Sequence, residues 1–229
     1  MAQRILTKYP RSIYKGTKEI KQHFKHLLVI DLECTCKKFE KIQPQEIIEL
    51  PCAAVSTTSW EIENMFHEYI KPRFNPKLTV FCTELTGIMQ DLVDNQPHFS
   101  EVFEKFCKWL KENNYSTDEN DSAFVTCGDW DLKYMLPSQC KLENMSLPPQ
   151  FSKWINLKTS FCDATEFYPR NLVDMLSHFD LPLHGRLHSG INDVENMVKI
   201  IQNLHSKYNF EFKINSMQGD ILRKFIKSG

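Results

Sequence analysis

Two carboxylates follow directly on an apolar run near the start of the chain. Residues Leu27 to Ile30 are apolar, and Asp31 and Glu33 come next, separated by a leucine. This pattern predicts a buried strand with both acids at its carboxyl end. Because strand side chains alternate, the acids share one face at a spacing of about 6–7 Å, where like charges repel unless a cation or a proton intervenes. A divalent metal site is one interpretation, and a solvated strand end is the other.

Further titratable groups stand at the ends of later elements. Asp129 and Asp131 follow the apolar run Ala123 to Cys127, and His188 precedes Asp193 at the start of a long amphipathic segment. Carboxylates hold hard divalent cations, and an imidazole accepts a proton near neutral pH. The pattern therefore favours metal-assisted hydrolysis over a purely structural use of these groups, provided that the fold brings them together.

The elements that must position these groups follow from hydrophobic periodicity. The strand patterns and helical patterns predict an α/β fold with a mixed central sheet of about five strands flanked by helices, in which the first three strands are antiparallel. The predicted strands are His26 to Thr35, Glu46 to Val55, Glu61 to Pro72, Ala123 to Cys127 and Trp154 to Leu157. The predicted helices are Thr83 to Ile88 with a threonine cap and a glycine stop, Phe99 to Leu110, a stretch ending at Leu142, Asn171 to Phe179, a long helix from Ile191, and a tail helix with Ile221, Leu222, Phe225 and Ile226.

Composition places limits on the partners. The 229 residues are 41% hydrophobic and carry a formal net charge of −1, so no global field attracts nucleic acid or an anionic membrane. Residues 1–25 are expected to form a basic arm, either on a phosphodiester backbone or as a solvated leader, and 26–229 a single domain. The eight cysteines form no Cys-x-x-Cys pair. We expect free thiols, no membrane span and an intracellular location, cytoplasmic or nuclear.

The order of these groups resembles that of the DEDDh exonucleases, a family with the RNase H-like, DnaQ-like fold. The similarity extends to the branch that contains the histone-mRNA and RNAi-suppressing 3′-to-5′ exoribonucleases and the fly enzyme Snipper. It covers the chain from about Leu27 to Tyr208. The residues that carry it are Asp31 to Cys36, Trp130-Asp131, Trp154 to Asn156 and Gly185 to Gly190. Leu32 and Cys34 depart from the Phe and Ala more common in the branch, which are apolar exchanges.

The resemblance assigns roles to individual residues. It implies two Mg²⁺ or Mn²⁺ ions per active site, with Asp31, Glu33 and Asp193 as ligands of the first and Asp31 and Asp131 as ligands of the second. His188 would be the general base. We choose Asp131 over Asp129 because an aromatic residue directly precedes it, and we expect Asp129 to cap the following helix. The residues expected to contact the 3′-terminal nucleotide are Phe81, Leu85, Thr86 and Trp130, each of which could instead belong to the core.

The implied activity is stepwise 3′-to-5′ exonucleolytic hydrolysis that releases nucleoside 5′-monophosphates. RNA is the expected substrate and DNA the alternative, and the sequence names no protein partner. Two rivals stay open: a catalytically silent nucleic-acid-binding module of the same fold, and a phosphoesterase of small phosphates. A histidine beside a glycine turn is ordinarily structural, and His184 lies only four residues before His188.

Overall fold

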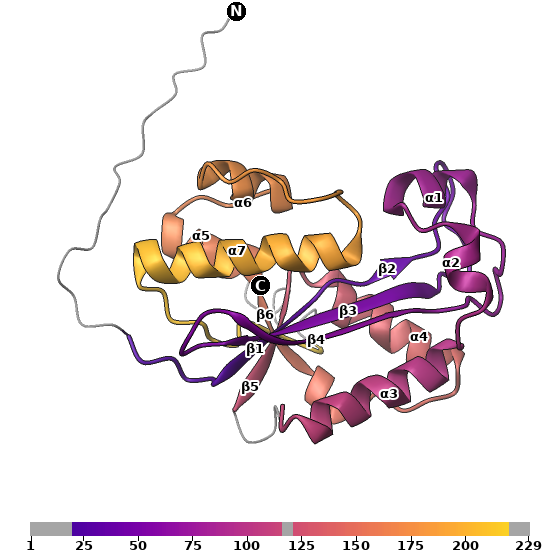
Figure 1. The fold of residues 1–229 in the computed structure, drawn as a ribbon, viewed down its shortest axis with the longest axis horizontal. Coiled ribbons are helices and arrows are strands. Elements are labelled where there is room, and N and C mark those ends of the chain that lie inside the picture. Colours follow the sequence, from indigo (N-terminus) through magenta and orange to yellow (C-terminus); the bar gives the residue numbers. More distant parts are fainter. Residues whose placement is uncertain (1–19, 116–120, 220–229) are drawn as a thin grey trace, which may run out of the picture.

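The computed structural model describes residues 20–115 and 121–219 (Figure 1). Within these residues a mixed seven-stranded sheet forms the centre, in the order β2-β3-β1-β5-β6-β7, with β4 paired to β3. The pairs β1–β3 and β3–β4 are antiparallel, as predicted, whereas β1–β5 and β5–β6 are parallel. The strands are β1 (His26–Ile30), β2 (Glu33–Cys34), β3 (Ile47–Ser56), β4 (Ile62–Tyr69), β5 (Ser122–Thr126), β6 (Lys153–Asn156) and β7 (Ser216–Met217).

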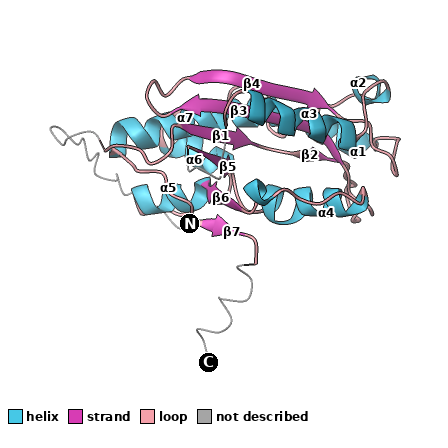
Figure 2. Ribbon diagram, turned by 90° about the horizontal axis from the view of Figure 1, so that it is seen from below, coloured by secondary structure: helices cyan, strands magenta, loops and turns pink. Residues whose placement is uncertain are grey.

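The sheet has seven strands in the described part of the chain, rather than the predicted number of about five. The prediction included β2 in the first strand and missed β7, because each contains only two residues, which is too short for an alternating pattern. Figure 2 shows the strands in order from β4 at one edge to β7 at the other. The predicted α/β architecture with a mixed sheet is therefore confirmed, and its strand count is corrected.

Helices cover both faces of the sheet (Figure 1). Leu28 and Ile30 pack into a core that includes α3, whereas Leu27 and Val29 pack into a second core beneath α7, as strand alternation requires. The helices are α1 (Val80–Thr86), α2 (Gln90–Asp94), α3 (Phe99–Glu112), a π-helical turn η1 (Asp131–Met135), α4 (Leu136–Leu142), a 3₁₀ turn η2 (Pro149–Phe151), α5 (Leu157–Thr165), α6 (Leu172–His178) and α7 (Gly190–Tyr208).

The boundaries of α1 correct one prediction. The helix begins at Val80, earlier than the predicted Thr83, because the hydroxyl of Thr79 accepts a hydrogen bond from the Cys82 backbone N–H. The predicted glycine stop is confirmed, since Gly87 ends the helix in the left-handed conformation at φ 78°. The start of α1 therefore lies three residues nearer to the chain segment that leaves β4.

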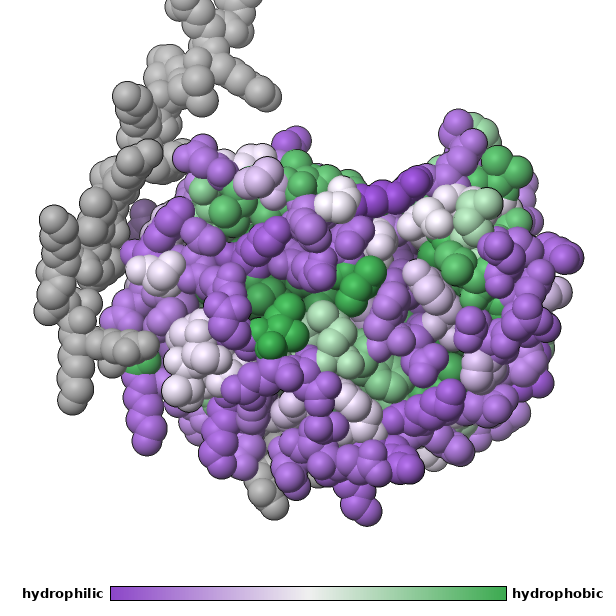
Figure 3. Space-filling view, in the orientation of Figure 1, coloured by the Kyte–Doolittle hydropathy of each residue, from purple (hydrophilic) through white to green (hydrophobic). Residues whose placement is uncertain are grey.

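The free state of the cysteines is confirmed, since all eight fall within the described residues and none is bonded to another. Among the helices of the described part of the chain, none has the length and apolar character to cross a membrane. Most of the predicted basic arm and the whole predicted tail helix lie outside the described residues. The surface in the view of Figure 3 is mostly hydrophilic, and its outline dips between the side of α6 and α7 and the side of α1.

Candidate active site

The predicted acids and the predicted histidine converge at one edge of the sheet. Asp31, Glu33, Asp131 and His188 line a pocket of about 240 Å³. Asp193 joins them from α7, because one ligand atom from each of Glu33, His188 and Asp193 lies within 4.8 Å of the others. Three segments separated by long stretches of sequence thus contribute to a single acidic site.

The end of β1 is tied directly to the third acid. Asp131 follows β5 in the first turn of η1, and its Oδ1 accepts a hydrogen bond of 3.0 Å from the backbone N–H of Leu32. Because β1 and β5 are parallel neighbours, their carboxyl ends meet at the same edge. This bond fixes the segment between β1 and β2 and holds Asp31 and Glu33 beside Asp131.

Asp129 does not cap the helix that follows it, contrary to the prediction. Its side chain accepts hydrogen bonds from Trp154 Nε1 at 3.1 Å, Asn156 Nδ2 at 2.9 Å and Ser216 Oγ at 2.8 Å. Burial raises the pKa of this carboxyl, but these three bonds together with Lys133 outweigh it and lower the pKa below its ordinary value. Asp129 therefore joins β6 and β7 to the end of β5, and Asp131 is the one that faces the pocket.

The loop before α7 places His188 and Asp193 together. His188 adopts a left-handed backbone with φ 62°, and its N–H donates to Asp193 Oδ2 at 2.8 Å. The other oxygen, Asp193 Oδ1, is buried and has no hydrogen-bond partner among the described residues. The His184 side chain is instead exposed, and its Nε2 lies 3.1 Å from Glu195 Oε2. The structure therefore places His188 at the pocket, whereas His184 is not among the residues that line it.

The acids of the pocket have raised pKa values because they are buried and close to one another. Burial, reinforced by neighbouring carboxylates, raises the pKa of Asp31 well above its ordinary value and that of Glu33 to about 9. Burial also raises the pKa values of Asp131 and Asp193 to about 6. These acids must hold protons or share a cation. The buried Asp193 Oδ1, which has no hydrogen-bond partner among the described residues, and the carboxylate of Glu33 beside it fit a hard divalent ion.

Glu49 is a site residue that sequence reasoning missed. It lies opposite Glu33 in the β2–β3 ladder, is 1% exposed, and accepts hydrogen bonds from the backbone N–H groups of Gly190 at 3.0 Å and Ile191 at 3.3 Å. His67 Nε2 lies 2.8 Å from Glu49 Oε1. A carboxylate bound to the first N–H groups of α7 fixes the start of that helix and hence Asp193. The available signal was an acid inside an apolar strand, which must have partners.

Comparison with known proteins agrees with this site. A model of the Exonuclease family RNase_T matches residues 28–201. The chain belongs to the DEDDh family of 3′–5′ exonucleases. It is 44% identical to human ERI1 exoribonuclease 3 over 184 residues, covering 80% of this chain and 54% of that protein, and 34% identical to Drosophila Snipper over 192 residues, covering 77% and 68%. The chain thus spans about half the length of the ERI1 exoribonuclease 3 proteins that it matches.

Solved structures give the same assignment. The nuclease domain of 3′hExo bound to rAMP, described as a DEDDh family member, superimposes with a TM-score of 0.79 at 31% identity, covering 87% of this chain and 100% of that one. Cell-death related nuclease 4 gives a TM-score of 0.80 at 29% identity, covering 86% and 69%. The mixed sheet and its flanking helices are therefore those of a DEDDh exonuclease.

Of the four residues predicted to contact a terminal nucleotide in this DEDDh chain, two line the acidic pocket. These are Leu85 and Trp130. Phe81 and Thr86 are not among its lining residues, and the Thr86 hydroxyl already bonds the Cys82 carbonyl and the Ile88 N–H. The sequence could not show which of Phe81, Leu85 and Thr86 faces the pocket, because all three belong to one short helix.

Arg186 connects the histidine loop to α1. Its guanidinium donates to the Glu84 carbonyl, and its side chain lies against Gly87, where a Cβ would come within 3.1 Å of Arg186 Cδ. The loop that carries His188 and the helix that carries Leu85, both of which line the pocket, are therefore tied to each other.

Proposed function

We propose that this chain is a divalent-metal-dependent 3′–5′ exonuclease that removes nucleotides from RNA and releases nucleoside 5′-monophosphates. The observation that carries the proposal is the convergence of Asp31, Glu33, Asp131, Asp193 and His188 in one pocket with an unsatisfied buried carboxylate oxygen. Similar proteins named exoribonucleases support it, as do neighbours solved with rAMP or described as recognising a histone mRNA stem-loop. DNA is the alternative substrate.

The four acids are proposed to hold two Mg²⁺ or Mn²⁺ ions. Glu33 and Asp193 belong to the first ion, Asp131 to the second, and Asp31 to both. Such ions neutralise charge on the phosphate and lower the pKa of water. Asp131 also keeps its hydrogen bond to Leu32, so it aligns the other ligands. The raised pKa values mean that the protons on these acids must leave before cations bind.

His188 is proposed to take the proton from the attacking water. The water oxygen then bonds to phosphorus, the bond to the departing 3′ oxygen breaks, and that oxygen takes a proton from solvent to become the 3′ hydroxyl of the shortened strand. Partial burial lowers the pKa of His188, which increases the neutral fraction available at pH 7. His188 lies close enough to Glu33 and Asp193 to be a ligand itself, but hard divalent ions prefer the oxygen ligands that surround it.

The terminal nucleotide is proposed to lie between Leu85 and Trp130, both of which line the pocket. Trp130 offers an exposed ring for base stacking. Phe81 and Thr86 would contribute from the same helix as Leu85. We also propose that 26–229 form one exonuclease domain preceded by the basic arm 1–25, and that the eight free thiols reflect an intracellular location, cytoplasmic or nuclear.

The experiment that tests this function uses a 5′-labelled RNA dodecamer with a free 3′ hydroxyl, the same strand circularised, and a DNA dodecamer, with Mg²⁺, with Mn²⁺ and with excess chelator. We expect stepwise shortening of the linear RNA, release of nucleoside 5′-monophosphates and no cleavage in chelator. Cleavage of the circle would indicate an endonuclease. Binding without cleavage would support a silent module, and release of inorganic phosphate from mononucleotides would support a small-molecule phosphoesterase.

A further inference from the structure

A second hollow opens directly from the acidic pocket. It is a groove of about 1010 Å³ that shares Cys36, Gln45 and Trp130 with the pocket. The substrate of an exonuclease extends beyond its terminal nucleotide, so the upstream strand must leave the pocket along some surface. Because the exposed ring of Trp130 lines both the groove and the pocket, the groove is a candidate surface for the upstream strand.

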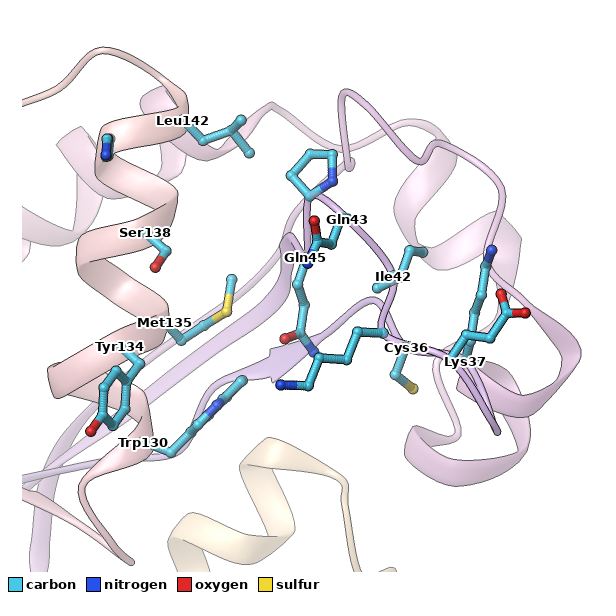
Figure 4. Close-up of a pocket in the computed structure, with 14 residues that line it drawn as sticks. Cys36, Lys37, Ile42, Gln43, Gln45, Trp130, Tyr134, Met135, Ser138 and Leu142 are labelled. Atoms are coloured by element: carbon cyan, nitrogen blue, oxygen red, sulfur yellow. The ribbon is translucent and has the colours of Figure 1, made fainter.

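The two walls of the groove come from segments far apart in the sequence. One is the helical stretch η1 and α4, and the other is the loop between β2 and β3, as Figure 4 shows. Trp130, Tyr134 and Ser138 recur every fourth residue and so lie on one helical face. Trp130 and Tyr134 are 42% and 48% exposed, although large aromatic rings are ordinarily buried. Two such rings on one wall form a surface on which successive bases can stack.

The charge of the groove is opposite to that of the pocket. Lys37 and Lys41 on the loop and Lys141 on α4 line it, with Glu40 as the only acid among its lining residues. This local excess of cations occurs in a chain whose formal net charge is −1. Ammonium groups on both walls, with aromatic rings on the helical wall, are the combination that binds the phosphates and bases of a single strand.

We infer that this groove binds the single-stranded RNA immediately upstream of the 3′-terminal nucleotide, with bases stacked on Tyr134 and phosphates beside Lys41 and Lys141. The inference rests on the proposed function and adds the path of the strand. From Trp130 to Lys141 the helical wall is roughly 16 Å long at about 1.5 Å per residue. At about 3.4 Å per stacked nucleotide, the wall accompanies roughly three to five nucleotides.

The test measures kcat/KM on 5′-labelled RNAs from a dinucleotide to a dodecamer. For the natural chain, kcat/KM should rise with length until the groove is filled, at roughly four to six nucleotides including the terminal one. Tyr134→Ala should lower kcat/KM on the dodecamer by roughly 10-fold, the order expected when a stacked base loses its ring. The loss should be smaller on the dinucleotide, which places only one nucleotide in the groove, and Tyr134→Phe, which keeps the ring, should behave like the natural chain.

A charge reversal tests the phosphate contacts separately. Lys141→Glu should weaken binding of a fluorescent RNA dodecamer in chelator, and should reduce the slope of log affinity against log salt by about 0.7, the value for one single-strand phosphate contact. Lys111→Glu on α3 is the matched control, because Lys111 is exposed but does not line the groove. It should leave both quantities unchanged.

The two proposals fail in different ways. If Tyr134→Ala and Lys141→Glu bind and degrade the dodecamer like the natural chain, the strand does not follow this groove, whatever the activity. If the natural chain cleaves no RNA, the proposed function fails, and the binding measurements still decide the groove. Weaker dodecamer binding by Lys141→Glu alone, without a length-dependent loss in Tyr134→Ala, would overturn the stacking arrangement.

Discussion

Two buried acidic regions adjoin β3 and use their carboxylates in opposite ways. Glu46, just before β3, is 1% exposed, and its carboxylate accepts hydrogen bonds from the backbone N–H groups of Arg73, Phe74 and Asn75. Glu33 in the pocket is also buried, but acids surround it and burial raises its pKa to about 9. Burial alone therefore does not identify a catalytic acid. A buried acid with hydrogen-bond donors around it is structural, whereas one surrounded by other acids is a catalytic candidate.

Glu49 marks the boundary between these regions. It is as buried as Glu46 and is likewise bonded to backbone N–H groups, here at the start of α7. It is also the direct neighbour of Glu33 across the β2–β3 ladder. A satisfied carboxylate thus supports the helix whose first turn carries an unsatisfied one, Asp193. Glu46 and Glu49 thus hold the backbone, whereas Asp31, Glu33, Asp131 and Asp193 are the acids proposed to bind cations.

The strongest test of this difference replaces one acid of each region by its amide. Asp31→Asn should reduce cleavage by more than about 10²–10³-fold, the loss that follows removal of one preorganised electrostatic contact. It should leave the metal-free protein at least as stable, because the amide replaces a carboxyl whose ionised form is disfavoured by burial and by the neighbouring acids. Single-turnover cleavage and thermal unfolding measure the two effects.

Glu46→Gln is the matched change in the other region. It should lower the unfolding free energy by about 1–3 kcal/mol, because the backbone N–H groups lose a charged acceptor, and it should leave cleavage per folded molecule unchanged. An active Asp31→Asn variant would contradict the role proposed for the pocket. An inactive but fully stable Glu46→Gln variant would reverse the assignment of the two regions.

The next effect in size belongs to His188. His188→Ala should slow single-turnover cleavage by about 10²–10⁴-fold, the usual contribution of general-base assistance, while RNA binding stays near normal because the acids are intact. For the natural chain the rate should rise with pH as the imidazole loses its proton, over a range displaced below the ordinary pKa by partial burial. His184→Ala is the control, since His184 contacts Glu195 outside the pocket. A dead His184 variant beside a normal His188 variant would overturn the assignment.

Sequence patterns predicted the acidic site well because its residues follow local signals. Asp31 and Glu33 end an apolar strand, and the His188 to Asp193 spacing opens a helix, so the family resemblance could be read from short segments. The structure brings the five proposed catalytic residues together. Their catalytic roles stay predictions until variants are measured.

The parts that sequence could not supply depend on distant partners. Asp129 was expected to cap a helix, yet its donors Trp154 and Ser216 lie 25 and 87 residues away. Glu49 receives its N–H donors from α7, 141 and 142 residues further on. The groove likewise forms only where the loop after β2 faces α4. Periodicity reports which face is buried, but not which side chains meet there.

The glycine at the start of α7, Gly190, lies against residues of the pocket and of β3, so its substitution tests how closely the helix must be placed. A Cβ on Gly190 would lie 2.8 Å from the Asp31 carbonyl oxygen, 2.9 Å from Pro51 Cγ and 3.1 Å from Glu49 Oε2, so the helix would have to move. Gly190→Ala should therefore displace Asp193 and reduce kcat by about 10²-fold, the order expected for a misplacement near 1 Å. Gly128→Ala is the control, because its Cβ would meet only the flexible end of Lys158 at 3.3 Å. Equal activity of the two variants would show that α7 tolerates displacement.

The smallest effect is a pH dependence of stability without metal. The pKa of Glu33 is about 9 in the folded chain against 4.5 ordinarily, so between these values the folded state holds a proton that the unfolded state has released. The unfolding free energy then falls as pH rises, because the unfolded state binds fewer protons.

In chelator, the melting temperature should decrease from about pH 7 to pH 8, a window above the pKa values of Asp131 and Asp193 and below the ordinary range of thiols. Glu33→Gln should show a shallower decrease, and Mg²⁺ should stabilise the natural chain more at the higher pH because proton competition for the carboxylates is then weaker. Parallel curves for the two proteins in chelator would show that Glu33 is already ionised, and that the acids of the pocket are stabilised by groups other than protons and cations.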